Sequence, residues 1–215
     1  MYIPKQFEEP RVEVMHDLIR AYPLATLVTH SSSGLNANHI PFNLLESPAP
    51  YGTLHGHIAR ANPLLSEAGE GIECLLIFHG PDAYITPAWY ATKKETAKVV
   101  PTWNYAVVHV YGVLHVIDDA SWLRTQLAAL TDHNEAAFSE PWAVSDAPTD
   151  YIEKNMAAIV GIEIEITRML GKWKVSQNQP SQNKITVVAG LKSSGLPDAE
   201  AMASLVEAGL DNVRA

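Results

Sequence analysis

The run YAVVHVYGVLHVI, residues 105–117, is a long alternating apolar stretch and predicts a β-strand. In Ile162–Ile166 the isoleucines alternate with Glu163 and Glu165, which is typical of a strand with one buried and one solvent-exposed face. Further strands are expected at 24–30, 36–45, 52–58, 72–78 and 83–87, the first two as a hairpin around the polar turn SSSG. Strands outnumber helices and cluster in the middle of the chain. This arrangement predicts a mainly β fold with α, an antiparallel barrel decorated by helices.

Helices are expected around this sheet. Met15, Leu18, Ile19 and Tyr22 recur at helical spacing, and Asp118 and Asp119 suit the positive end of a helix carrying Leu123, Leu127 and Leu130. A short helix is expected to open at Asn62-Pro63, and longer ones cover 181–194 and 198–208, whereas 137–150 is interpreted as a loop. We expect one domain over residues 1–194, with an N-terminal helix, and a C-terminal helical tail, 195–215, packed on it.

Composition restricts the classes of function. The formal net charge of the 215 residues is -9, and the only basic patch found, Lys93, Lys94 and Lys98, includes Glu95, so the charge gives DNA binding weak support. No apolar run is long enough for a membrane span, and the first residues lack signal-peptide order, so a cytoplasmic protein is expected. The single Cys74 lies in an apolar run and is interpreted as a structural, unreactive thiol.

No glycine-rich GxGxxG or GxxxxGK[ST] motif is present, so side chains must hold any nucleotide. GHIARANP, residues 56–63, supplies His57, Arg60 and a helix start at Asn62 that could bind a phosphate. The alternative is a solvated loop arginine and a strand histidine with its own hydrogen-bond partners.

Two further clusters could contact a ligand. Trp89, Tyr90, Trp103, Tyr105 and Tyr111 lie close in sequence to Lys93, Lys94 and Lys98, a combination that suits a flat conjugated ring with an anionic tail. Core packing and a mobile basic loop explain the same residues equally well. Residues 171–184, GKWKVSQNQPSQNK, could close over a ligand or form an ordinary polar connection.

The histidines suggest a different class of protein. His55 and His57 would project from one face of a strand, where two imidazoles can bind zinc or iron with His109 or His115 as a third ligand. A nearby carboxylate at the usual spacing is missing, so no metal site is assigned. A serine hydrolase is less favoured still, because the sequence has no GxSxG elbow.

Taken together, these stretches resemble the PaiB-like family of FMN-binding negative transcriptional regulators, within the FMN-binding split-barrel superfamily. The resemblance extends over nearly the whole chain. It rests on MYIPKQF (1–7), HIPFNL (39–44), LHGHIARANP (54–63), VPTWNYAVVHVYG (100–112) and KWKVSQN (172–178).

The resemblance implies a split antiparallel β-barrel that forms a homodimer with FMN at the subunit interface. It implies that His57, Arg60 and Asn62 lie near the phosphate. Around the rest of the cofactor it implies Trp89, Tyr90, Lys98, Thr102, Trp103 and Asn104, with Lys172, Ser176, Gln177 and Asn178 from the far strand.

Two functions remain open beside the histidine-metal enzyme. The first is a PaiB-like FMN-binding protein acting as a negative transcriptional regulator, and the second is a flavin-dependent oxidoreductase, since a bound flavin is itself competent for electron transfer. The resemblance favours the first by a narrow margin. No catalytic residue is assigned.

Overall fold

The strands form one continuous sheet. The computed structural model describes residues 1–32, 34–67 and 71–211. Its strands are β1 (Glu8–Glu9), β2 (Leu24–Ser31), β3 (Gly34–Pro41), β4 (Asn43–Leu45), β5 (Thr53–Ala59), β6 (Ile72–Ile85), β7 (Thr102–Ile117) and β8 (Ile159–Lys174). They are hydrogen-bonded in the order β3-β2-β6-β7-β8-β5-β4, and β1 pairs with β8. The β1–β8, β2–β3, β2–β6, β4–β5 and β5–β8 pairs are antiparallel, which confirms the predicted fold class.

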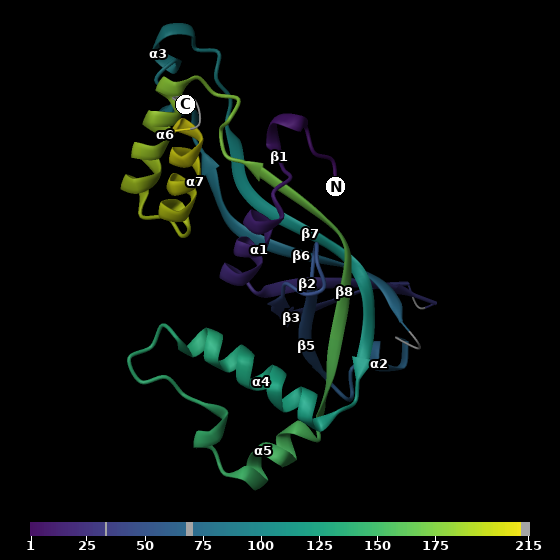
Figure 1. Ribbon diagram of the computed structural model, residues 1–215. Coiled ribbons are helices and arrows are strands. Elements are labelled where there is room, and N and C mark those ends of the chain that lie inside the picture. The colour runs from purple at the N-terminus through teal and green to yellow at the C-terminus, as the bar shows by residue number, and fades with distance from the viewer. Residues whose placement is uncertain (33, 68–70, 212–215) are drawn as a thin grey trace. The chain divides into compact units, whose positions relative to one another are not determined.

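Most of the helices lie close to where helices were predicted, but two short ones, at 93–96 and 149–156, were not predicted (Figure 1). They are α1 (Val12–Ala21), α2 (Leu64–Glu67), α3 (Lys93–Thr96), α4 (Ala120–Glu135), α5 (Thr149–Met156), α6 (Ser181–Ser194) and α7 (Ala199–Asp211). Short 3-10 turns occur at Lys5–Phe7, Pro87–Trp89 and Val144–Asp146. Among the residues described, no helix has the length and apolar character needed to cross a membrane.

The chain divides into two structural units that interleave along the sequence. Unit 1 comprises Met1–Arg11, His79–Val108 and Leu170–Ala215, and unit 2 comprises Val12–Phe78 and His109–Met169. The strands β6, β7 and β8 contribute residues to both units, whereas α6 and α7 belong to unit 1 alone. The division into residues 1–194 and a tail at 195–215 stays a prediction.

Three strand predictions need correction. The segment 36–45 is not one strand, because β3 pairs with β2 and ends at Pro41, while β4 pairs with β5. Phe42 lies at the break with its side chain 2% exposed, and its N–H donates to the carbonyl of Pro23 (3.0 Å). Conversely, 72–78 and 83–85 are parts of one strand, β6, which ends at Ile85, so that Pro87 lies in a 3-10 turn and not in a strand. The strand predicted at Ile162–Ile166 is present but longer, as β8. In the predicted hairpin turn, Ser33 lies outside the described residues.

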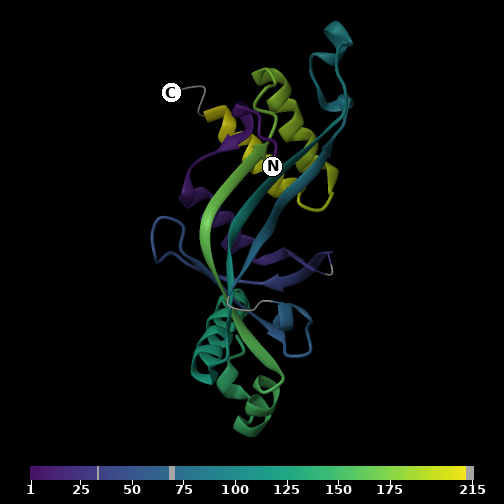
Figure 2. The same cartoon turned by 90° about the vertical axis from the view of Figure 1, so that its right-hand side faces the viewer.

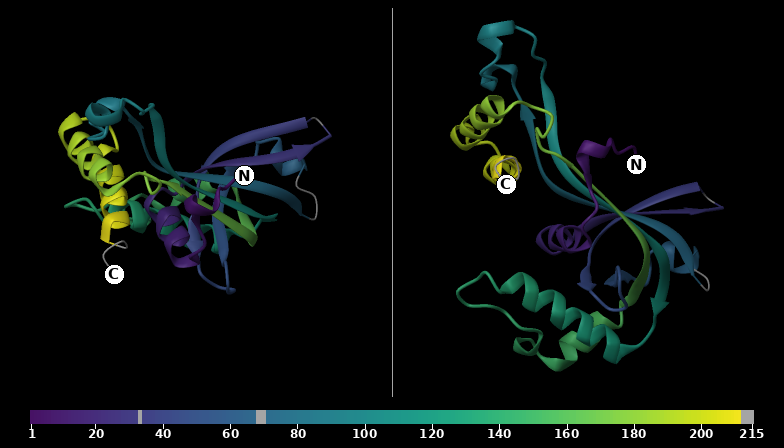
Figure 3. Two further views of the ribbon diagram at one scale, coloured as in Figure 1. Left: turned by 90° about the horizontal axis from the view of Figure 1, so that it is seen from above. Right: turned by 45° about the horizontal axis from the view of Figure 1, so that its top comes forward.

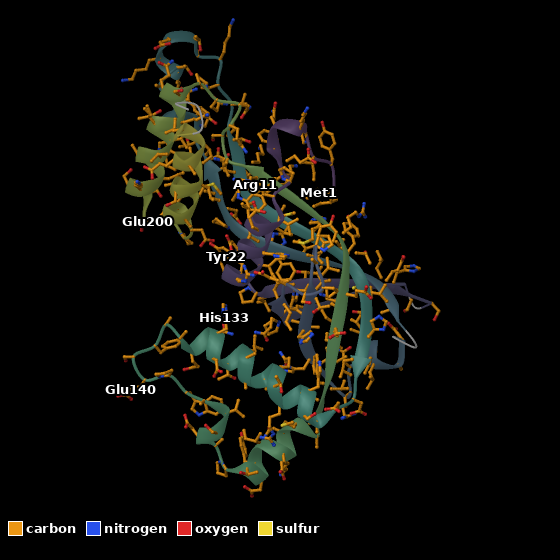
Figure 4. The ribbon with its side chains drawn as sticks, viewed as in Figure 1. Met1, Arg11, Tyr22, His133, Glu140 and Glu200 are labelled. Atoms are coloured by element: carbon orange, nitrogen blue, oxygen red, sulfur yellow. The ribbon has the colours of Figure 1, made fainter. Side chains whose placement is uncertain are left out.

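The predicted loop at 137–150 is only partly a loop. It contains a 3-10 turn and the first residues of α5, a helix that the sequence patterns did not indicate. The preceding helix, α4, begins as predicted, because Asp119 caps it by accepting from the N–H of Trp122 (2.8 Å). Figure 3 shows the connection between α4 and α5. Near the C-terminal end of α4, His133 is hydrogen-bonded to the carbonyl of Arg20 (3.0 Å) (Figure 4).

Cys74 lies in the core of unit 2, as its apolar surroundings predicted. Its side chain is 7% exposed and its thiol donates to the carbonyl of Gly112 (3.5 Å). Burial raises the pKa of the Cys74 thiol to about 12. The thiol is therefore protonated at neutral pH and is a poor nucleophile.

Unit 1 has its own apolar core. Figures 2 and 3 show α6 and α7 beside each other, and their buried residues pack with Ala83, Ile85 and Tyr90. Trp89 lies against α6 at Gly190, where a β-carbon would approach the indole ring to 2.4 Å. The core therefore requires glycine at this position of the helix. The short helix α3 stands at the tip of the connection between β6 and β7 (Figure 2).

Candidate functional site

The residues expected at a ligand divide between the two units. His57, Arg60 and Asn62, the group assigned to a phosphate, lie in unit 2. The remaining members, from Trp89 to Asn178, lie in unit 1. Each group is described within its own unit.

His57 faces α4 in unit 2. Its Nδ1 is hydrogen-bonded to Oε1 of Gln126 (2.9 Å), and because that oxygen only accepts, Nδ1 carries the proton. Gln126 is 3% exposed, and its amide donates onward to Asn43 Oδ1 (3.3 Å). His57 is thus part of a polar chain between β5, α4 and β4.

Arg60 is exposed but has protein partners. Its guanidinium forms an ion pair with Asp118, contacting both carboxylate oxygens, and its Nε donates to the carbonyl of Ala157 (3.1 Å). The hydrogen bond from Arg60 holds the pKa of Asp118 below its usual range, and the same bond raises the pKa of Arg60. These residues border a cavity of about 730 Å³ lined also by Arg124 and Glu153.

Asn62 starts α2 as predicted. Its side-chain oxygen accepts from the N–H of Leu64 (3.0 Å), and its amide nitrogen donates to Asn38 Oδ1 (2.9 Å). Its hydrogen-bond partners differ from those of His57 and Arg60. In the described residues the three side chains therefore share no partner, and their joint contact with a phosphate stays a prediction.

In unit 1, successive side chains of β7 point to opposite faces of the sheet, so neighbouring residues of the predicted ligand-binding set lie on different faces. Asn104 is 1% exposed and donates to Ser176 Oγ (2.9 Å), whereas Trp103, on the opposite strand face, is 54% exposed. The Trp103 ring lies edge-on to Tyr84, with centroids 5.9 Å apart. Asn104 anchors the loop after β8, and Trp103 offers an accessible aromatic surface.

The loop between β8 and α6 is held by its own polar side chains. Ser176 is 3% exposed and has a left-handed backbone conformation (φ 64°). Gln177 folds back, so that its Oε1 accepts from the N–H of Val175 (2.7 Å) and its amide donates to the carbonyl of Trp173. Asn178, the next residue, is exposed.

The other residues of unit 1 that were predicted to bind the cofactor lie outside this loop. Lys172 donates to the carbonyl of Tyr2 (3.2 Å) and lies 5.2 Å from the centre of the Tyr105 ring. Tyr90 is 4% exposed in the core, and burial raises its pKa. Trp89 packs on Gly190, and Lys98 is exposed. Tyr90 and Trp89 thus have core contacts of their own.

Several residues of this region were absent from the predicted set. Lys174 donates to Thr102 Oγ1 and to the carbonyl of Trp103 (2.8 Å), which ties β8 to β7. Asn183, 2% exposed, donates to Thr92 Oγ1 (3.0 Å) and Gln179 Oε1 (3.0 Å). Lys174 was visible in the KWKVSQN motif. The role of Asn183 has no local signal, because its partner Thr92 lies 91 positions away.

The histidine-metal hypothesis gains no geometric support. His55 Nε2 pairs with Glu163 Oε2 (2.8 Å), and its ring packs on Trp122 with centroids 4.7 Å apart. His57 is bound to Gln126 instead. In the described part of the chain, no group of at least three His, Cys, Asp or Glu side chains could hold a metal ion.

The side chains around the end of β8 are of the aromatic and polar types that commonly contact a flavin nucleotide. Trp103 and Tyr84 present exposed aromatic surface. Each of the donors in this region, Lys172, Lys174 and the amides of Asn104 and Gln177, already donates to a protein oxygen. The fold and these side-chain types are those of a split-barrel protein of the flavin-binding class.

Comparison with known proteins identifies the family. The family described as "Putative FMN-binding domain" matches residues 1–168, so the chain belongs to this FMN-binding, PaiB-like family. An uncharacterised protein of Emericella nidulans is 34% identical, with 96% of each chain covered. The protease synthase and sporulation protein PAI 2 of Bacillus subtilis is 28% identical, with 96% of this chain and 97% of that protein covered.

A solved structure agrees on the fold. The FAD and heme binding protein of Mycobacterium smegmatis superposes with a TM-score of 0.59 at 20% identity, covering 85% of this chain and 80% of that one. At this identity the likeness concerns the fold alone, which is the predicted split barrel. Family membership confirms the expectation of a flavin cofactor.

Proposed function

We propose that this protein binds FMN and serves as a PaiB-type negative transcriptional regulator in the cytoplasm. The observation that carries flavin binding is the exposed aromatic pair of Trp103 and Tyr84 beside the polar end of β8. Exposed aromatic surface with donors at its rim is typical of a ligand or interaction site. The regulatory role rests on the family resemblance.

A spectrum of freshly purified protein tests flavin binding. We expect flavin absorption bands, or their appearance when FMN is added, and release of FMN on denaturation. A protein that neither retains flavin nor quenches the fluorescence of added FMN would contradict the proposal.

We also propose a homodimer with FMN at the subunit interface. Val100, Trp103 and Tyr84 leave apolar side chains exposed in unit 1, and self-association would cover surface of this kind. Light scattering at low micromolar concentration should report twice the mass of the chain. A clean monomer mass rules out a shared flavin site.

A flavin-dependent oxidoreductase is the second candidate, because the residues proposed to contact the flavin would serve either function. Turnover of a reduced nicotinamide would favour it, whereas a saturable, sequence-specific DNA shift would favour the regulator. DNA binding should be weak and local, from the exposed Lys93, Lys94 and Lys98 near α3. A steep dependence of affinity on salt would mean many phosphate contacts and contradict this expectation.

Arg60→Ala tests the proposed phosphate contact in unit 2. If Arg60 reaches the phosphate, the substitution should weaken FMN binding by about one to two orders of magnitude and leave the fold intact. Fluorescence quenching titrations, with thermal melts alongside, measure both effects.

Asp118→Asn is the matched control, because it removes the charge of the carboxylate that holds Arg60. If Arg60 binds phosphate, freeing it should preserve or strengthen FMN affinity. If the ion pair only links the start of α4 to the rest of unit 2, both variants should show the wild-type affinity. That result would remove Arg60 from the phosphate site.

A further inference from the structure

A row of three polar residues crosses the sheet in unit 2. His55 of β5 lies directly opposite Asn43 of β4 on one side and directly opposite Glu163 of β8 on the other. Residues that oppose each other in antiparallel strands project from the same face of the sheet, with their β-carbons about 4.5–5.5 Å apart. The side chains of Asn43, His55 and Glu163 are therefore neighbours on one face.

Glu163 determines which ring nitrogen of His55 carries the proton. Nε2 of His55 lies 2.8 Å from Oε2 of Glu163, and because an ionised carboxylate only accepts, Nε2 is the donor of the neutral imidazole. Nδ1 is then an acceptor, and it has no partner among the described residues. The ring is held in place by its contact with Trp122. His55 thus offers a lone pair in a fixed position.

Gln126 orients the amide of Asn43 in a similar way. Oε1 of Gln126 accepts from His57, so the amide nitrogen of Gln126 is the group that donates to Oδ1 of Asn43 (3.3 Å). The amide nitrogen of Asn43 remains as a donor, and the described part of the chain provides no acceptor for it. A donor on Asn43 and an acceptor on His55, both without partners, therefore stand on directly opposed residues.

Asn43 and His55 both line a cavity of about 700 Å³, a volume typical of small-molecule sites. Among the described residues of its wall, Asp119 is the only ionised one, and it already accepts from Ser121 and from the N–H of Trp122. The cavity therefore suits a neutral ligand better than an anion. Its apolar wall consists of Leu44, Leu45, Ile117, Trp122 and Ala129.

We propose that this cavity binds a planar heterocycle with a lactam edge, a ligand of the nucleobase class. A lactam has an N–H beside a carbonyl group, so the N–H donates to Nδ1 of His55 while the carbonyl accepts from the amide of Asn43. The apolar wall covers the faces of the ring. None of the wall residues belongs to the set predicted to hold FMN, so this site goes beyond the proposed function.

Uracil and 1,3-dimethyluracil test the site in the wild-type protein. Uracil has the lactam edge, whereas the dimethyl compound keeps both carbonyl groups but has no N–H. We expect isothermal titration calorimetry to show that uracil binds about 10-fold more tightly or better, because the dimethyl compound leaves the acceptor on His55 unpaired. A protein that binds neither compound, or binds both equally, contradicts the proposal.

Asn43→Asp tests the donor. Aspartate has nearly the same shape and still accepts from Gln126, but it replaces the amide nitrogen by an oxygen, which repels the carbonyl of the ligand. We expect uracil affinity to fall by about 10- to 100-fold. His55→Phe keeps an aromatic ring beside Trp122 and removes the acceptor, so it should lower uracil affinity by about 10-fold.

Asn36→Asp and His30→Phe are the matched controls. They make the same changes in β3 and β2, and neither residue lines the cavity. Both variants should bind uracil as the wild type does. If Asn43→Asp and His55→Phe lower the Tm but leave uracil affinity unchanged, the polar row only joins the strands and the proposal is wrong.

Competition with FMN separates this site from the flavin site, because a flavin ring also has a lactam edge. We expect uracil to bind with the same affinity in the presence and absence of FMN. Displacement of uracil by FMN would assign the cavity to the flavin and overturn the proposal of a separate site. A protein that binds uracil but no flavin contradicts the proposed function alone.

Discussion

Replacing Gly112 by alanine is expected to lower the free energy of unfolding by about 2–4 kcal/mol. A β-carbon on Gly112 would lie 2.4 Å from the carbonyl oxygen of Glu165 and 2.7 Å from Ile164 Cγ2. The first neighbour is backbone of the adjacent strand β8, which cannot move without disturbing the sheet. Urea denaturation followed by circular dichroism measures the change.

Gly209→Ala provides the control for this experiment. Gly209 lies in α7, and a β-carbon there would meet no atom within 4 Å. Because alanine is favoured over glycine inside helices, this variant should be as stable as wild type or more stable. If Gly112→Ala were equally well tolerated, the close approach of β7 and β8 at this glycine would be wrong.

Asn104→Ala should also destabilise the protein, by about 2–3 kcal/mol. The substitution removes a buried amide and leaves the 3% exposed Ser176 hydroxyl without its donor. Because Ser176 belongs to the loop that leads into α6, FMN affinity should fall as well. Urea denaturation and fluorescence titration measure the two effects separately.

A double-mutant cycle with Ser176→Ala isolates the hydrogen bond. Once either partner is absent, loss of the other should cost less, so the two changes should not be additive. Additive effects on stability would show that Asn104 and Ser176 act independently. The 2.9 Å contact between them would then contribute nothing measurable.

Cys74 and Arg60 show which structural features local sequence patterns can predict and which they cannot. The apolar run around Cys74 was enough to predict a buried thiol, because strand burial follows a short-range periodicity. Arg60 was expected at a phosphate, and its pairing with Asp118, 58 positions away, was not foreseen. No local pattern specifies which carboxylate a surface arginine meets.

Local signals also located most elements but not all their boundaries. Asp119 marks the start of α4 because a cap acts within a few residues of itself. The break at Phe42 and the continuity of β6 through Gly80 and Pro81 depend instead on which strand lies alongside. Pairing between distant strands overrides the turn preference of the dipeptide.

The sequence by itself predicted the fold class through the alternation of apolar residues, and its resemblance to the PaiB-like family implied the flavin cofactor, because alternation and short motifs are local properties of the chain. Only the tertiary structure revealed that Asn104 holds Ser176 and that Asn183 holds Thr92. Both facts depend on packing within unit 1. Burial and pairing are properties of surfaces brought together by folding, and the order of residues along the chain does not encode them locally.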